Sequence, residues 1–180
     1  DVTGSLTATG GTIALTASNA AGGLSLAGPL NAATVDLSAG TGGIAQPGGS
    51  ISATTLRAAV AGGNATLGQA SNSIAALGNS TVTGGTLTVV DSAALTVSGT
   101  VKADAVALTD SAAGTAITLT GSLATTASGT ITLTASNPTG AIALAGTLDA
   151  TATGIVDLTA GANVTQRAGG EAAGTLRHVG

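Results

Sequence analysis

Short aliphatic triplets recur along the chain, each with a small or polar residue between two aliphatic ones. Ile13-Ala14-Leu15, Leu87-Thr88-Val89 and Ile131-Thr132-Leu133 are examples. Alternation with a period of two is typical of a strand that buries one face. Turn-forming pairs such as Gly22-Gly23 and Asn137-Pro138 separate the triplets. The pattern predicts many short strands and no amphipathic helix of useful length.

The triplets also recur at a regular spacing. Ile13 and Leu24 are 11 residues apart, and Val35, Leu56 and Leu77 follow one another at steps of 21. Two steps of 11 make one coil of a β-solenoid, in which short strands stack from coil to coil. We therefore predict an all-β fold, a parallel β-helix of about eight coils of roughly 20–22 residues. An antiparallel sandwich or propeller is the alternative, but such folds use longer strands and aromatic cores.

A long duplication underlies this spacing. Residues 10–32 recur at 128–150 with 14 of 23 positions identical and a constant offset of 118. The offset becomes 121 where Val35 matches Val156, and we place the extra residues in a turn at 152–154. Residues 1–57 thus resemble residues 119–177, and the repeated unit is expected to span about six coils. We interpret residues 1–180 as a single solenoid segment.

The composition limits which side chains can form the core and which partners the chain can bind. The 180 residues contain no Phe, Tyr, Trp, Cys or Met, so the core must be thin and built from Leu, Ile, Val and Ala. The net charge is −4, and the four basic residues are scattered, which argues against nucleic-acid binding. Without cysteine there are no disulfides or thiolate metal sites. No apolar run is long enough to predict insertion of this segment into a membrane.

Neither end of the chain carries a recognisable signal peptide or a capping helix. Unpaired strand edges at the ends of a solenoid would promote aggregation unless they are covered. We therefore expect the chain to be a fragment of a longer rod, with the same solenoid continuing at one or both ends.

The repeats resemble those of a known family. Residues 11–17 (GTIALTA), 129–135 (GTITLTA) and 85–89 (GTLTV) look like the Gly-x-Ile/Leu-x-Leu repeats of filamentous-haemagglutinin-like and autotransporter-type bacterial surface adhesins. The resemblance covers essentially the whole chain. It implies a right-handed parallel β-helix that is secreted to the cell surface, at the outer membrane, and that serves in attachment or as a spacer. The chain lacks the secretion region and the membrane barrel of such proteins.

Paired carboxylates are the main candidates for chemistry, because some β-helices cleave polysaccharides. Asp91 and Asp110 are about one coil apart, and Asp104 lies nearby. Stacked carboxylates offer the oxygen ligands that a divalent cation prefers. The competing interpretation, two solvated turn carboxylates, is favoured here.

The other polar candidates are interpreted as structural. Asp36 and Asp157 are middle residues of triplets and should face solvent, and His178, the only histidine, lies near the end of the chain. Three Asn-x-Ser/Thr patterns occur, at Asn64, Asn79 and Asn163. Paired threonines such as Thr86 and Thr88 suggest an ice-binding ladder, but a step of one coil replaces Thr86 with Ala107, which breaks the pair.

The sequence therefore favours a structural role. We predict a stalk or adhesive segment that contacts host-cell or neighbouring-cell surface ligands and has no catalytic, cofactor-binding or metal-binding residues. A β-helical carbohydrate-active enzyme and a threonine-rich ice-binding solenoid are the alternatives. Carboxylates converging in a groove would indicate the first alternative, and threonines in register on one flat face would indicate the second.

Overall fold

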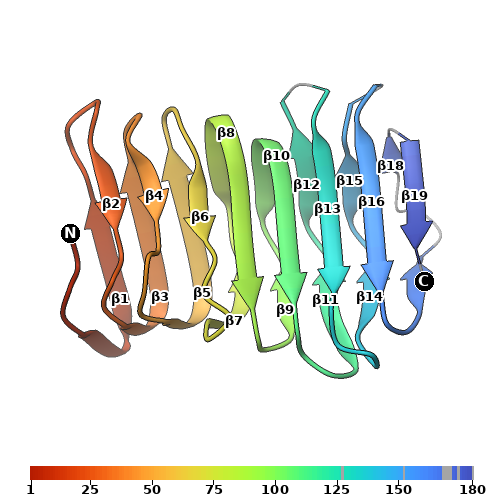
Figure 1. Cartoon of the computed structure of the whole chain (residues 1–180), viewed down its shortest axis with the longest axis horizontal. Helices are drawn as coiled ribbons and strands as arrows, with labels where there is room; N and C mark the ends of the chain where they lie inside the picture. Colours follow the sequence, from red (N-terminus) through yellow and green to blue (C-terminus); the bar gives the residue numbers. More distant parts are fainter. Residues whose placement is uncertain (127, 152, 168–171, 174, 180) are drawn as a thin grey trace.

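The chain winds into a rod of stacked parallel strands, with its ends at opposite ends of the rod (Figure 1). This computed structural model describes residues 1–126, 128–151, 153–167, 172–173 and 175–179, and side chains are described as far as residue 167. The strands are β1 (Leu6–Thr16), β2 (Gly23–Ser25), β3 (Leu30–Ala39), β4 (Gly43–Ala45), β5 (Ile51–Val60), β6 (Ala65–Leu67), β7 (Ser73–Leu77), β8 (Ser80–Asp91), β9 (Leu95–Val97), β10 (Thr100–Asp110), β11 (Thr115–Leu119), β12 (Ser122–Thr125), β13 (Thr130–Ala135), β14 (Ala141–Leu144), β15 (Thr147–Asp149), β16 (Ile155–Ala160), β17 (Val164–Gln166), β18 (Ala172–Ala173) and β19 (Thr175–Val179).

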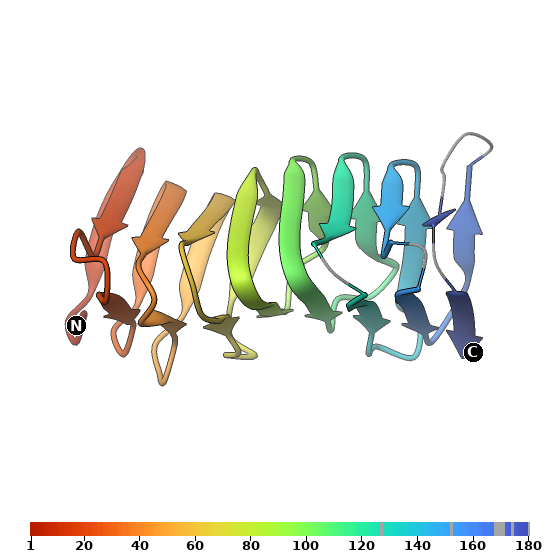
Figure 2. The ribbon, with the colours of Figure 1, turned by 90° about the horizontal axis from the view of Figure 1, so that it is seen from above.

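The described strands pair into three rows that run along the rod, and all of the pairs are parallel. Row A contains the first parts of β1, β3 and β5, followed by β7, β9, β11, β14 and β17. Row B contains the last parts of β1, β3 and β5, the first parts of β8 and β10, and then β12, β15 and β18. Row C contains β2, β4, β6, the last parts of β8 and β10, and then β13, β16 and β19. Figure 2 shows the rows from above.

Aliphatic columns fill the space between the rows. The column of row A consists of Ile13, Val35, Leu56, Leu77, Val97, Leu119 and Leu144, and the exposed Gln166 takes the next place in register. The column of row C consists of Leu24, Ile44, Ala65, Leu87, Val106, Ile131 and Val156, and the backbone of residue Leu176 takes the next place in register. Their inner members are almost completely buried. Eight places in a column make about seven complete turns, so the predicted all-β parallel solenoid with a thin aliphatic core is confirmed.

The coils vary in length more than the sequence spacing suggests. In row C the coil from Leu87 to Val106 is short, whereas the coil from Ile131 to Val156 is clearly longer. The turn insertion predicted at 152–154 falls in this long coil, between β15 and β16, and residue 152 of it lies outside the described residues. There Thr151 adopts a φ of 58°, and its backbone N–H donates to Asp149 Oδ1 at 2.9 Å. Additional residues are accommodated in turns, which leaves the strand register intact.

The two copies of the duplication lie on different rows. Ile13 belongs to the column of row A, but its copy Ile131 belongs to that of row C. Leu119, the sixth member of the row A column, completes five turns from Ile13, and the path from there to Ile131 adds half a turn. The duplication therefore spans five and a half coils rather than the predicted six.

The local structure of the two copies is nevertheless the same. In the first copy the Gly22 N–H donates to Asn19 O at 2.8 Å, and in the second the Gly140 N–H donates to Asn137 O at 2.7 Å. One sequence thus forms the same turn on two sides of the rod. The two sides offer equivalent environments: a short strand with aliphatic neighbours above and below.

Candidate functional site: a buried polar ladder

Asp91 and Asp110 occupy neighbouring places in a stack, as their spacing predicts. They end β8 and β10 and are direct partners in the parallel pair between these strands. Both side chains are 0% exposed, so the favoured interpretation as solvated turn carboxylates is wrong. The alternation explains their direction: Leu87, Val89 and Asp91 occupy every second place and therefore point to the same side of β8.

Asp91 closes its own coil through its carboxylate. Oδ1 accepts a hydrogen bond from the backbone N–H of Ile74, at the start of the coil, at 2.9 Å. Oδ2 accepts one from the backbone N–H of Ala93, just after it in the chain, at 3.1 Å. The side chain thus supplies acceptors at a corner where Ile74 would otherwise have a buried donor without a partner.

Asp110 repeats this arrangement one coil later. Its Oδ2 accepts from the Leu95 N–H at 3.0 Å, and its Oδ1 accepts from the Ala112 N–H at 2.6 Å. The local sequence begins in the same way, Asp-Ser-Ala-Ala, at 91–94 and 110–113. This recurrence is a sequence signal for a repeated corner that the prediction missed.

Two neutral side chains extend the stack in the other direction. Asn72 is 0% exposed, and its Oδ1 accepts a hydrogen bond from the Ile51 N–H at 2.8 Å, just as Asp91 Oδ1 accepts one from the Ile74 N–H. Asn72 Nδ2 donates to Val90 O at 3.0 Å, and Gln46 Nε2 donates to Asn72 Oδ1 at 2.8 Å. We call Gln46, Asn72, Asp91 and Asp110 the polar ladder.

Serines bind the outer side of the same corner. Ser92 Oγ donates to Asn72 O at 2.6 Å, Ser111 Oγ to Asp91 O at 3.3 Å, and Ser136 Oγ to Asp110 O at 3.1 Å. Each bond joins one coil to the coil before it. The hydroxyls therefore satisfy the backbone carbonyls of the ladder, while the ladder side chains satisfy amides.

Burial determines the electrostatics of the two aspartates. Loss of hydration and, to a smaller extent, the charge of Asp110 together raise the pKa of Asp91 from 3.8 to about 6, against the lowering effect of the N–H groups of Ile74 and Ala93. Burial likewise raises the pKa of Asp110, while the N–H groups of Ala112 and Leu95 lower it. The carboxylate oxygens are directed at backbone amides, and within the described chain no group of three or more His, Asp or Glu side chains is placed to hold a metal ion.

The remaining acidic candidates lie apart from the ladder. Asp104 is half-buried and accepts a hydrogen bond from Thr126 Oγ1. Asp36 points outward between two buried residues, as predicted, and forms an ion pair with Arg57 one coil later at 3.7 Å. Asp157 is also half-buried in the middle of its triplet. The side chains of Glu171 and His178 lie outside the described residues.

The threonine and asparagine candidates prove to be coil-to-coil contacts. Thr86 and Thr88 are aligned with Ala105 and Ala107, so the threonine pair is interrupted one coil further on by alanines. Asn64 and Asn79 are exposed, and the Oδ1 atom of each accepts a backbone N–H of the next coil, from Thr86 and Thr100 respectively, both at 2.9 Å. Asn163 is exposed.

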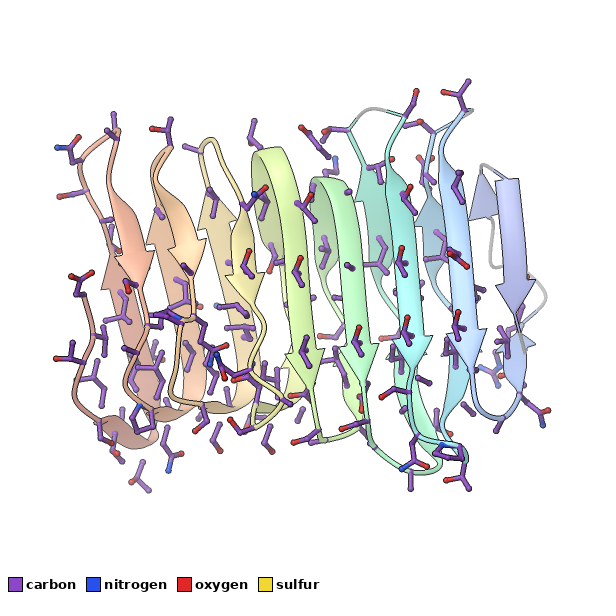
Figure 3. All side chains as sticks on the ribbon, viewed as in Figure 1. Atoms are coloured by element: carbon purple, nitrogen blue, oxygen red, sulfur yellow. The ribbon has the colours of Figure 1, made fainter. Side chains whose placement is uncertain are left out.

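A shallow groove crosses several coils where β1, β3 and β5 bend. Its volume is about 450 Å³, and its lining is made of small side chains, among them Thr9, Asn31, Ser52 and Ser73. No carboxylate contributes to its lining. Most of the side chains drawn in Figure 3 are correspondingly short.

These features define a parallel β-helix whose core, in the described part of the chain, is aliphatic apart from the polar ladder and the buried side chains of Ser80 and Thr125. Comparisons with protein-family models, with curated proteins and with solved structures find no match for this chain. No helix able to cross a membrane is found in the described part of the chain.

Proposed function

We propose that this chain is a rigid stalk segment of a large secreted bacterial surface protein, and that it mediates attachment or holds other parts at a distance from the cell. The observation that carries the proposal is the continuity of the aliphatic columns. The row A column passes through every coil from Ile13 to Leu144 with aliphatic members only. Each coil is thus held to its two neighbours, and length is gained by adding coils.

The chemistry of the wall suits such a role. The chain has 7% charged residues, and the exposed positions of its described part are mostly Thr, Ser, Asn, Ala and Gly. Backbone hydrogen bonds between coils supply stiffness, while the turns vary in length without disturbing the rows. Where the wall contacts a ligand, we propose a host-cell or neighbouring-cell surface molecule that meets small hydroxyl and amide groups such as those along the groove at β1, β3 and β5.

Two measurements test the proposal. Protease treatment of intact producing cells should cleave the protein, whereas an intracellular protein would be protected until the cells are lysed. Beads coated with the chain should then either adhere to host or bacterial cells, which assigns an adhesive wall, or remain inert while small-angle scattering shows an extended rod, which assigns a spacer. A protein confined to the cytosol, or a chain without an extended shape, would overturn the proposal.

A further inference from the structure

A second depression in the wall lies over the ends of β1, β3 and β5, where an ion pair joins two coils. Its volume is about 250 Å³, and its polar lining consists of Thr16, Asp36, Ser38, Arg57 and Asn79. None of these residues lines the groove described above. Ligand pockets usually have about 300–1,000 Å³, so this depression fits one small ring and not a long chain. We call it the Asp–Arg pocket.

One carboxylate oxygen in this pocket lacks a hydrogen bond. Asp36 Oδ1 is closed off from solvent, and among the described residues it is the buried side-chain oxygen that has no hydrogen-bond partner. The Arg57 Nη1 atom lies 3.7 Å away, which is too far for a hydrogen bond. A buried acceptor without a donor is unfavourable. Because the Arg57 side chain is 53% exposed and free to move, a hydroxyl group of a ligand can enter between the two, donate to Asp36 and accept from Arg57.

The internal duplication repeats the charged pair. Asp157 and Arg177 are the copies of Asp36 and Arg57, and the parallel strands align each aspartate with its arginine one coil later. The side chain of Arg177 lies outside the described residues. The whole chain has only four basic residues, and two of them occupy this place in the repeat. An exposed ion pair contributes little to stability, so stability alone does not account for a pair that both copies keep.

The hydroxyl groups beside the pair are repeated as well. Thr16 and Ser38 are direct partners in the first copy, and their counterparts Thr134 and Thr159 are direct partners in the second. Because the two copies lie on different rows, the rod carries the same combination of residues on two sides.

The chemistry of the pocket limits the kind of ligand. A carboxylate only accepts hydrogen bonds, and a guanidinium only donates them. An acidic ligand would be repelled by Asp36 and a basic ligand by Arg57, so a neutral ligand is favoured. Each hydroxyl group of a sugar both donates and accepts, and Asn79 adds a donor, since its Oδ1 is occupied by the Thr100 N–H. The alanines of β1 and β5 in the lining leave room for the apolar face of a sugar ring.

We infer that the Asp–Arg pocket binds one neutral sugar ring of a cell-surface glycan, with one hydroxyl group bridging Asp36 and Arg57. The inference rests on the proposed attachment role and specifies the chemical class of the ligand. The second pair, Asp157 and Arg177, forms a second site of the same kind. Two weak sites on one rod bind a surface that carries many copies of the sugar more strongly than either site does alone.

The test is a titration of the isotopically labelled chain with neutral methyl glycosides of galactose, glucose and mannose, followed by the amide resonances. At least one glycoside should shift the amides of residues 36–38 and 57–59, with a dissociation constant on the order of 1 mM. R57A and D36A should each weaken this binding about tenfold or more, because each removes a charged hydrogen-bond partner. K102A is the matched control: Lys102 is exposed and lies outside the pocket, so its loss should leave the binding unchanged. In R57A the amides next to Asp157 should still shift, because the second pair is intact.

Three results would overturn the inference. In the first, no neutral glycoside shifts these amides at concentrations well above the expected dissociation constant, or R57A binds as the parent does. In the second, methyl glucuronide binds more tightly than methyl glucoside, which would make Arg57 a site for carboxylates. In the third, the neutral peptide analogue N-acetylglycinamide occupies the pocket and the sugars do not, which would make the partner a protein. The location of the rod on the cell is tested separately: a surface rod that binds no sugar remains a spacer, whereas a sugar-binding chain confined to the cytosol would refute only the stalk.

Discussion

Replacement of Asp91 by asparagine removes a buried charge from the polar ladder and should change how stability depends on pH. The pKa of Asp91 is about 6 in the folded protein, against 3.8 as the ordinary value. The folded state therefore binds this proton more tightly than the unfolded state does. Its contribution to stability is fully present below pH 3.8 and is lost as the pH rises through about 6. At about 1.4 kcal/mol for each pKa unit, the parent should lose about 3 kcal/mol across this range.

The structure also predicts that asparagine fits this place. Asn72 is buried one coil earlier and accepts the Ile51 N–H, as Asp91 accepts the Ile74 N–H. In the variant the amide oxygen can keep the bond from Ile74, but the NH₂ group cannot accept from Ala93. That loss costs about 1 kcal/mol. D91N should therefore be about 1 kcal/mol less stable than the parent near pH 4 and about 2 kcal/mol more stable near pH 7.

The assay is urea unfolding at pH 4, 5, 6 and 7, followed by far-ultraviolet circular dichroism because the chain has no aromatic residue. D149N is the matched control: Asp149 is exposed and accepts a local N–H from Thr151. It should follow the pH profile of the parent, whereas the D91N profile should be flatter, because only the raised pKa of Asp110 remains in the ladder. A parent that is more stable at pH 7 than at pH 4, or a D91N profile parallel to that of the parent, would refute the reasoning.

Three further substitutions test the packing. G121A should lower the free energy of unfolding by about 1–3 kcal/mol, because a Cβ at this position would overlap the backbone oxygen of Gly99. The control G68A places its Cβ 3.9 Å from its nearest neighbour and should be tolerated. Thermal melting of both variants compares them. L133D should abolish cooperative melting, because Leu133 is 0% exposed between Leu108 and Leu158 and the variant buries an unpaired charge; the outward control T118D should melt close to the parent, and an L133D melt that matched the parent would contradict the inward placement. R57A should cost less than about 1 kcal/mol in urea unfolding, since Arg57 and Asp36 are 53% and 38% exposed, and a loss of several kcal/mol would show that the pair anchors its coil.

Periodicity predicts most of this fold because the core obeys one simple rule. Every inward-facing residue in a β-helix has a neighbour one coil above and one below. Aliphatic-x-aliphatic triplets that recur once per coil therefore fit few other folds. The same rule places Asp91 inside, since it follows Leu87 and Val89 at every second position. The general expectation that charged side chains face solvent was preferred to this alternation. Asp91 was therefore predicted to be solvated, although it is buried. The repeated Asp-Ser-Ala-Ala motif was the signal that a corner, and not the surface, required these carboxylates.

Register could not be predicted as well as fold, because the turns vary. The coils from Leu87 to Val106 and from Ile131 to Val156 differ in length within the same row, so no fixed step aligns one strand with the next. Thr86 is an example: the regular step of the sequence pattern aligns it with Ala107, whereas the structure aligns it with Ala105. The turn chemistry that sets these lengths is local and leaves little trace in the hydrophobic pattern.

The half-coil displacement of the duplication explains why the polar ladder is short. Ala135 occupies the ladder position in the coil after Asp110, and it is the copy of Ala17, which lies after the β1 strand on another side of the rod. The aliphatic columns tolerate this exchange because every column accepts Leu, Ile or Val, so a segment moved by half a coil still builds a core. The ladder does not tolerate it, since a carboxylate or amide is useful only at the corner where an amide N–H needs an acceptor. Gln46 and its copy Gln166 illustrate the point: the first is buried in the ladder at 6% exposure, and the second is exposed in row A. Asp91 and Asp110, the charged members of the ladder, therefore lie only in the coils between the two copies. The half-coil displacement leaves the aliphatic core continuous, but it limits the coils in which the rod can hold a buried carboxylate.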